Sequence, residues 1–187
     1  MSAPFATALL IPLVLLPPTG PPRTVVEADF DRASAFVPSA AVSHAQDLVP
    51  YGAHVRVVVE RAAGRTAVAL TVSGLAPGHE FPAHVHTGAC GADPAASGPH
   101  YQDVPDPVQP STDPAYANER NELRLTLRTD GAGADAANAS VAWAVRAGEA
   151  RSIVLHAGHP GGALPDAAGA AGAVRASDRV ACVNVPF

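Results

Sequence analysis

The chain has 187 residues, with a hydrophobic content of 48% and a formal net charge of -5. This length and apolar content predict one globular domain with a tail, because domains commonly run from about 100 to 200 residues. The net charge is negative and the sequence has no lysine, so it shows no sign of the basic patch that nucleic-acid binding requires. We therefore expect no nucleic-acid partner.

The N-terminal segment combines an apolar run with prolines. Residues 5–16 are apolar, a run too short to span a bilayer and typical of a signal-peptide core. We predict a signal peptide over residues 1–20 and no stable membrane span. Because no basic residue precedes Arg23, an uncleaved anchor and a misplaced start codon are the alternatives. Residues 21–39, with prolines and mixed charges, are interpreted as a linker to a domain over residues 40–187.

Beyond the linker, the hydrophobic pattern is that of β-strands. Apolar and polar residues alternate in short segments at residues 53–60, 68–72, 122–128 and 139–145. Further short strands are predicted at residues 81–86, at the apolar segment 152–157 and at 179–185. The single tryptophan, Trp143, falls on an inward position and is interpreted as core. About eight short strands without an amphipathic helix predict an all-β sandwich or flattened barrel. Two long irregular segments, residues 88–121 and 159–177, are the expected functional loops.

Four histidines form the candidate metal site. His84 and His86 are two apart on a predicted strand, so both imidazoles leave the same face and can reach one metal ion. His100 in the first long loop and His156 at the end of another strand complete the set. Four imidazoles without a thiolate or carboxylate suit Cu(II). By itself, a His-x-His pair is also compatible with two ordinary semi-buried histidines.

The sequence contains two cysteines, Cys90 and Cys182. Behind an apolar N-terminus, two cysteines are typical of one disulfide in an extracytoplasmic protein. Closing so long a loop would stabilise the fold by roughly 4 to 5 kcal/mol in the chain-entropy model. Two buried free thiols are the alternative, since free cysteine is a common core residue.

These motifs, in this order, resemble the copper/zinc superoxide dismutase family, and most closely the copper-only members of its bacterial extracytoplasmic branch. The resemblance covers residues 41–185. It rests on Gly-Leu-x-Pro-Gly at 74–78, His-Val-His at 84–86, Cys90, Gly-Pro-His-Tyr at 98–101, His156 and Arg-x-Ala-Cys at 179–182. It implies an eight-stranded Greek-key β-barrel that converts two superoxide anions to oxygen and hydrogen peroxide.

The resemblance also implies a role for each site residue. The copper ligands are His84, His86 and His156, together with His100, which bridges copper and zinc in two-metal members and can deliver a proton to the reduced product. Cys90 and Cys182 are implied to form the internal disulfide of the family. Arg179 is implied to be the arginine that attracts and orients superoxide. A solvated charge at the rim is the alternative for Arg179.

One departure from the family concerns zinc. The family supplies further histidine ligands after the bridging histidine, but no histidine lies between Tyr101 and Glu122. Zinc is therefore doubtful. Glu119 and Glu122 stand near the missing ligands, and one or both are predicted to hydrogen-bond His100 and hold its ring. Two exposed carboxylates are the alternative. Weak zinc binding by His100 stays open, with Asp103, Asp106 or Asp113 as the further ligands.

Two other departures affect the surroundings of the copper ligands. Pro82-Ala83 replaces the Gly-Phe of the family before the first copper histidine, and the 159–177 loop is mostly Gly and Ala. That loop should steer anions less strongly than a charged one. His159 is either a fifth group near the metal or a surface histidine. We expect an exported copper-dependent superoxide dismutase; the alternatives are a non-enzymatic protein for copper storage or delivery and a degenerate fold kept for protein contacts.

Overall fold

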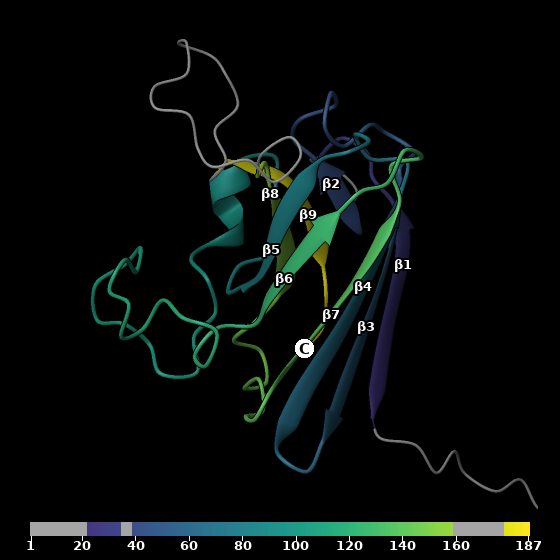
Figure 1. Ribbon diagram of the computed structural model, residues 1–187. Helices are drawn as coiled ribbons and strands as arrows, with labels where there is room; N and C mark the ends of the chain where they lie inside the picture. The colour runs from purple at the N-terminus through teal and green to yellow at the C-terminus, as the bar shows by residue number, and fades with distance from the viewer. Residues whose placement is uncertain (1–21, 35–38, 159–177) are drawn as a thin grey trace, which may run out of the picture.

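The structure, a computed structural model, describes residues 22–34, 39–158 and 178–187 (Figure 1). In this part of the chain it contains nine strands and one short 3-10 helix: β1 Arg23–Asp29, β2 Ala41–Ser43, β3 His54–Ala62, β4 Arg65–Ser73, β5 Glu80–His86, η1 Pro94–Ser97, β6 Arg124–Arg128, β7 Asp135–Val141, β8 Ser152–His156 and β9 Arg179–Asn184. No helix among these residues is long and apolar enough to cross a membrane. The predicted signal peptide and the 159–177 loop lie outside the described residues.

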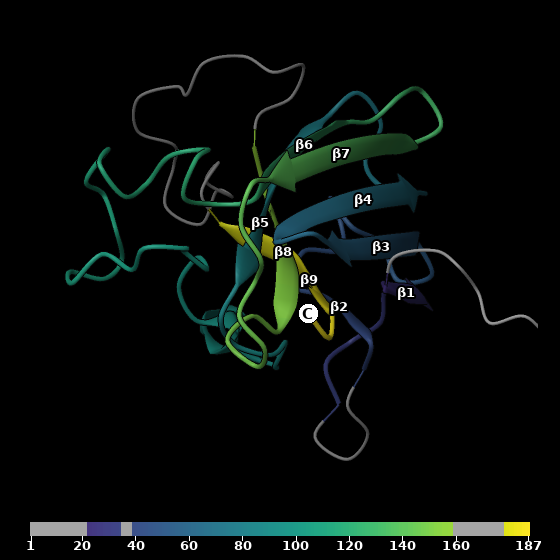
Figure 2. The same cartoon turned by 90° about the horizontal axis from the view of Figure 1, so that it is seen from below.

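The strands form two antiparallel sheets that face each other as layers (Figure 2). One sheet has the order β1-β3-β4-β7 and the other the order β2-β9-β8-β5-β6. The pairs β4–β7 and β5–β8 join strands that are not consecutive in the chain, which is the connectivity of Greek-key folds. The all-β sandwich expected from the sequence is therefore confirmed.

The core forms because alternate side chains of each strand point between the two sheets. On β3, Val55, Val57 and Val59 are fully buried, and Leu70 on β4 meets them from the neighbouring strand. Phe81 on β5 belongs to the same apolar cluster from the opposite sheet. At about 25 cal/mol per Å² of apolar surface, each such side chain stabilises the fold by roughly 1.5 to 3 kcal/mol. This rigid core fixes the strand ends that carry the site.

The expectation of a linker over residues 21–39 was wrong for its first part. Residues 23–29 form β1, which pairs with β3 from Arg23↔Glu60 to Asp29↔His54. The outward positions of this strand carry three charged side chains, as edge strands often do, together with the exposed Val25, and the inward side chains are small and only partly buried. The weak apolar pattern explains why the strand reads as a linker. With β1 and the short β2, the described residues contain nine strands instead of about eight.

A second difference concerns the segment around Trp143. The predicted strand runs to residue 145, but β7 ends at Val141. The backbone N–H of Val145 donates to Thr66 Oγ1 at 3.0 Å instead of to a neighbouring strand. Trp143 packs against the core while half-buried, and its indole N–H donates to the carbonyl oxygen of Arg120 at 2.8 Å. The segment around Trp143 therefore connects the loop before β6 to the core.

Candidate metal centre

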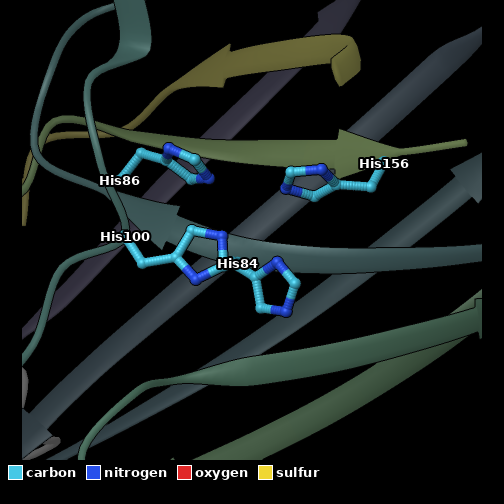
Figure 3. Close-up of side chains that lie close together, drawn as sticks. All are labelled: His84, His86, His100 and His156. Atoms are coloured by element: carbon cyan, nitrogen blue, oxygen red, sulfur yellow. The ribbon is translucent and has the colours of Figure 1, made fainter. Parts of the chain in front are cut away.

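The structure brings together the four predicted histidines (Figure 3). One ligand nitrogen from each of His84, His86, His100 and His156 lies within 4.8 Å of the others. This is the one group of three or more His, Cys, Asp or Glu side chains at metal-binding separation in the described part of the chain. Figure 3 shows the rings of His86 and His156 pointing toward each other. The rings of His84 and His100 are stacked, with centroids 4.2 Å apart.

Strand pairing explains why these histidines converge. His84 and His86 share one face of β5, and β8 lies directly beside β5. His156 is the last residue of β8, where the pairing with β9 shifts register between Leu155 and His156. His100 lies in the long loop, but an isolated antiparallel bridge pairs it with His86. Backbone pairing therefore brings the four histidines together without the help of a metal ion.

The donor atoms fit a metal ion. The ring of His86 is held by a hydrogen bond from Nδ1 to the carbonyl oxygen of Gly98 at 2.9 Å, so Nδ1 carries the proton and Nε2 is left as a bare acceptor. That Nε2 atom, like Nδ1 of His84, is buried without a hydrogen-bond partner. Leaving a polar atom buried and unpaired costs about 1 to 3 kcal/mol. A bound metal ion would satisfy both nitrogens.

The electrostatics of the cluster favour neutral imidazoles. Burial, reinforced by the neighbouring His100 and His156, lowers the pKa of His84 to about 2. Burial likewise lowers the pKa of His86 to about 3, against the hydrogen bond to Gly98, which acts in the opposite direction. Neutral imidazole is the form that coordinates a metal. The cluster is therefore ready to bind at neutral pH without releasing protons from these two rings.

Glu122 holds the ring of His100, as one of the two predicted carboxylates. Its Oε2 lies 3.1 Å from His100 Nδ1, and the same oxygen accepts two hydrogen bonds from Arg124, at 2.9 and 2.7 Å. Oε1 accepts from Gln102 Nε2 at 2.9 Å. Burial raises the pKa of Glu122, but the hydrogen bonds from His100, Gln102 and Arg124 outweigh it and hold the pKa at about 2. The carboxylate is ionised and fully engaged.

The prediction for Glu119 was wrong. Its side chain is exposed, and it makes no hydrogen bond or ion pair with His100. The two glutamates diverge because Glu122 enters the buried start of the β6 segment, while Glu119 remains on the loop surface. Sequence reasoning also missed Gln102 and Arg124. Arg124 follows Glu122 by two residues, the spacing at which side chains share a strand face, so that signal was present.

Arg179 lies beside the cluster. It is the register partner of His156 across β8 and β9, and its charge is close enough to lower the pKa of His86. The guanidinium Nη1 donates to the carbonyl oxygen of Pro94 at 3.0 Å and to Ser97 Oγ at 2.9 Å. Burial lowers the pKa of Arg179, and the carboxylate of Asp93 opposes that shift. Arg179 is thus a half-buried, fixed cation rather than a freely solvated rim charge.

Cys90 and Cys182 form a disulfide, so the alternative of two free thiols was wrong. The bond joins residues 92 positions apart, with a Cα–Cα distance of 5.6 Å. It links the loop that follows β5 to the centre of β9. The backbone N–H of Cys90 also donates to Asn184 Oδ1 at 2.9 Å. The start of the long loop is therefore fixed to the strand that carries Arg179.

The other carboxylates of the long loop have partners of their own. Asp103 Oδ1 accepts from Arg146 at 3.4 Å, and Asp113 Oδ1 caps a turn through the N–H of Ala115 at 2.8 Å. Asp106 is buried and accepts from Ser111 Oγ at 2.6 Å. None of them joins the histidine group within the described residues. His159 lies outside the described residues.

The comparisons with known proteins found similarity among solved structures. No protein-family model matches the chain, and no curated protein matches it. Among solved structures, the fold is similar to that of a Cu/Zn superoxide dismutase from Brucella abortus, with a TM-score of 0.50 and 19% sequence identity. The match covers 89% of this chain and 100% of that chain. This likeness shows the fold, and the disulfide and the histidine cluster fit the same family.

Proposed function

We propose that the protein is a superoxide dismutase that binds one copper ion through His84, His86, His100 and His156. The observation that carries the proposal is that four imidazole nitrogens converge beside a fixed arginine. Two of these nitrogens, His84 Nδ1 and His86 Nε2, are buried without a hydrogen-bond partner. A set of nitrogen donors without thiolate or carboxylate suits copper. When bound, copper would take an electron from one superoxide and return it to a second, giving oxygen and, with two protons, hydrogen peroxide.

The side chains of the protein have separate roles in this reaction. The guanidinium of Arg179 attracts the small anion and orients it, because its charge is permanent and its donors are planar. His100 supplies a proton to the product: its side chain is 31% exposed, so it can regain that proton from water. Glu122 holds the His100 ring in place through Nδ1. The other three histidines project from β5 and β8, and the Gly98 carbonyl holds the ring of His86.

We further propose that the site holds copper alone. In two-metal members of the family, the second nitrogen of the bridging histidine binds zinc. Here His100 Nδ1 is hydrogen-bonded to Glu122, whose carboxylate also accepts hydrogen bonds from Arg124 and Gln102. The carboxylates of Asp103, Asp106 and Asp113 are engaged elsewhere. Copper-loaded protein should therefore contain one equivalent of copper and retain no zinc after dialysis.

The disulfide supports an extracytoplasmic location. Disulfides persist in oxidising compartments and are rare in the cytosol. A bond that closes a 92-residue separation and fixes the loop beside the site belongs to the folded framework. We therefore propose that the protein acts in the cell envelope or outside the cell, where it would remove superoxide. Detection of the protein in the periplasmic or secreted fraction, with Cys90 and Cys182 oxidised, tests this placement.

The deciding experiment measures superoxide dismutation by the copper-loaded protein, with an Arg179→Ala variant alongside. We expect kcat/KM to fall by about tenfold in the variant, because the steering charge is lost. Copper content, determined on the same samples, should stay at one equivalent, since Arg179 is not a ligand. Copper bound without activity in the wild-type protein would favour the storage or delivery alternative, and absence of copper binding would overturn the four-histidine site.

A further inference from the structure

A single helical turn, η1, holds the side chain of Arg179. The guanidinium nitrogen Nη1 of Arg179 has two hydrogens and donates both to residues of this helix. One goes to the carbonyl oxygen of Pro94 and the other to Ser97 Oγ. The Ser97 hydroxyl in turn donates to the same Pro94 carbonyl at 2.9 Å. Donation to Pro94 turns an oxygen lone pair of Ser97 toward the guanidinium. Ser97 is 1% exposed, so water cannot replace its hydroxyl.

The turn itself is rigidly placed. Asp93 caps its start by accepting the N–H of Ala95 at 2.8 Å, and the carbonyl of Ser97 accepts the N–H of Gly88 at 2.8 Å. A Cβ at Gly88 would collide with the backbone of Ala96 and Ser97, so the two segments are in the closest possible contact. Along the chain, Cys90 lies between Gly88 and η1, and its disulfide ties this connection to Cys182 on β9. Ser97 therefore presents its hydroxyl at a fixed place on the protein.

The same segment also supports a metal ligand. Gly98, directly after η1, accepts the hydrogen bond from His86 Nδ1 through its carbonyl oxygen. Gly98 has φ +68°, and a Cβ there would meet Thr87 Oγ1 at 2.6 Å, so glycine is required. Residues 94–98 thus position both the arginine and one histidine. The relative placement of cation and metal is determined by a five-residue segment.

We propose that Ser97 is a positioning residue for Arg179, which sets the plane of the guanidinium so that its remaining donors face a small anion beside the histidine cluster. This inference rests on the proposed function and specifies how the site orders its substrate. With Nη1 engaged by η1, Nε and Nη2 make no hydrogen bond to the described part of the chain. These are the edges from which a guanidinium binds an anion in bidentate fashion.

The test compares Ser97→Ala with the conservative Ser97→Thr variant in the copper-loaded full chain. We expect Ser97→Ala to lower both kcat/KM for superoxide and the affinity for azide, measured by visible absorption, by roughly three- to tenfold. Ser97→Thr, which keeps a hydroxyl, should recover most of this loss. Copper content should remain at one equivalent in both variants, because no ligand is altered.

A matched control separates positioning from stability. Ser43 is also a buried serine whose hydroxyl donates to a backbone carbonyl, that of Val49, outside the site. Ser43→Ala should lower the midpoint of denaturation while leaving azide affinity unchanged. A further readout uses the metal-free protein: the side-chain NMR signal of Arg179 Nε–H should shift and broaden in Ser97→Ala only.

The results distinguish this inference from the proposed function. If Ser97→Ala keeps the wild-type azide affinity and the wild-type Arg179 signal, Ser97 does not position the arginine. If the wild-type protein fails to dismutate superoxide, the proposed function is wrong, while the azide and NMR comparisons still decide the role of Ser97. If copper is not bound at all, the NMR comparison alone decides it.

Discussion

Glu122→Gln is expected to weaken copper binding by about 10- to 100-fold, the usual effect of removing a group that orients a ligating histidine. The carboxylate accepts hydrogen bonds from His100, Gln102 and Arg124, all of which are donors. A carboxamide offers only one acceptor oxygen and places an NH₂ group against another donor. His100 then loses the acceptor that fixes its protonated nitrogen. Competition with a chelator of known affinity measures the change.

The same variant should also destabilise the metal-free protein, by about 2 to 4 kcal/mol, because a buried hydrogen-bond network loses its shared acceptor. The matched control is Glu119→Gln, which makes the same chemical change three residues earlier on an exposed side chain. It should alter neither copper affinity nor the free energy of unfolding. Equal behaviour of the two variants would show that Glu122 does not hold the His100 ring.

Removing the disulfide with the double substitution Cys90→Ser and Cys182→Ser should lower the free energy of unfolding by about 4 to 5 kcal/mol in the chain-entropy model. The bond closes a 92-residue separation, so it removes many conformations from the unfolded chain. Urea denaturation of the metal-free protein, oxidised and reduced, gives the comparison. The reduced wild-type protein should behave as the double variant does.

The disulfide variant should also disturb Arg179 more than the histidines. Cys90 lies between Gly88 and η1, whereas His84 and His86 belong to β5 and keep their strand partners. In protein that remains folded, we therefore expect weaker azide binding with copper still bound. An unfolding midpoint equal to that of the oxidised wild-type protein would contradict the stabilising role of the bond.

The core strands could be predicted because their apolar alternation is strong. Val55, Val57 and Val59 repeat with period two, and so do Val68 and Leu70 on β4, so the strands and their buried faces follow directly. β1 escaped prediction because an edge strand needs only one buried face, and its inward side chains are small. The end of β7 was misplaced because Val145 is buried in the core although its backbone N–H donates to Thr66 Oγ1 rather than to a neighbouring strand.

The metal ligands could be found from sequence because metal chemistry restricts residue type and a strand restricts spacing. Their supports could not be found in this way. The contact between Arg179 and Ser97 joins residues 82 apart, and nothing in the local sequence of either one indicates it. The same holds for Gln102, which is 20 residues from Glu122. Such contacts depend on how a long loop folds back on a sheet, which no periodicity records.

The residues of the metal site and their supports lie on one of the two sheets and its loops, and the other sheet is free of the constraints that the site imposes on sequence. None of the ligands, supports or cysteines discussed above lies on the β1-β3-β4-β7 sheet. Its outward positions can therefore drift, provided that the inward valines stay. Its β3–β4 hairpin turn, where Ala63 and Gly64 are exposed, offers an insertion point for a tag or a fusion partner. Relatives and engineered derivatives can thus differ widely in surface while keeping one metal chemistry.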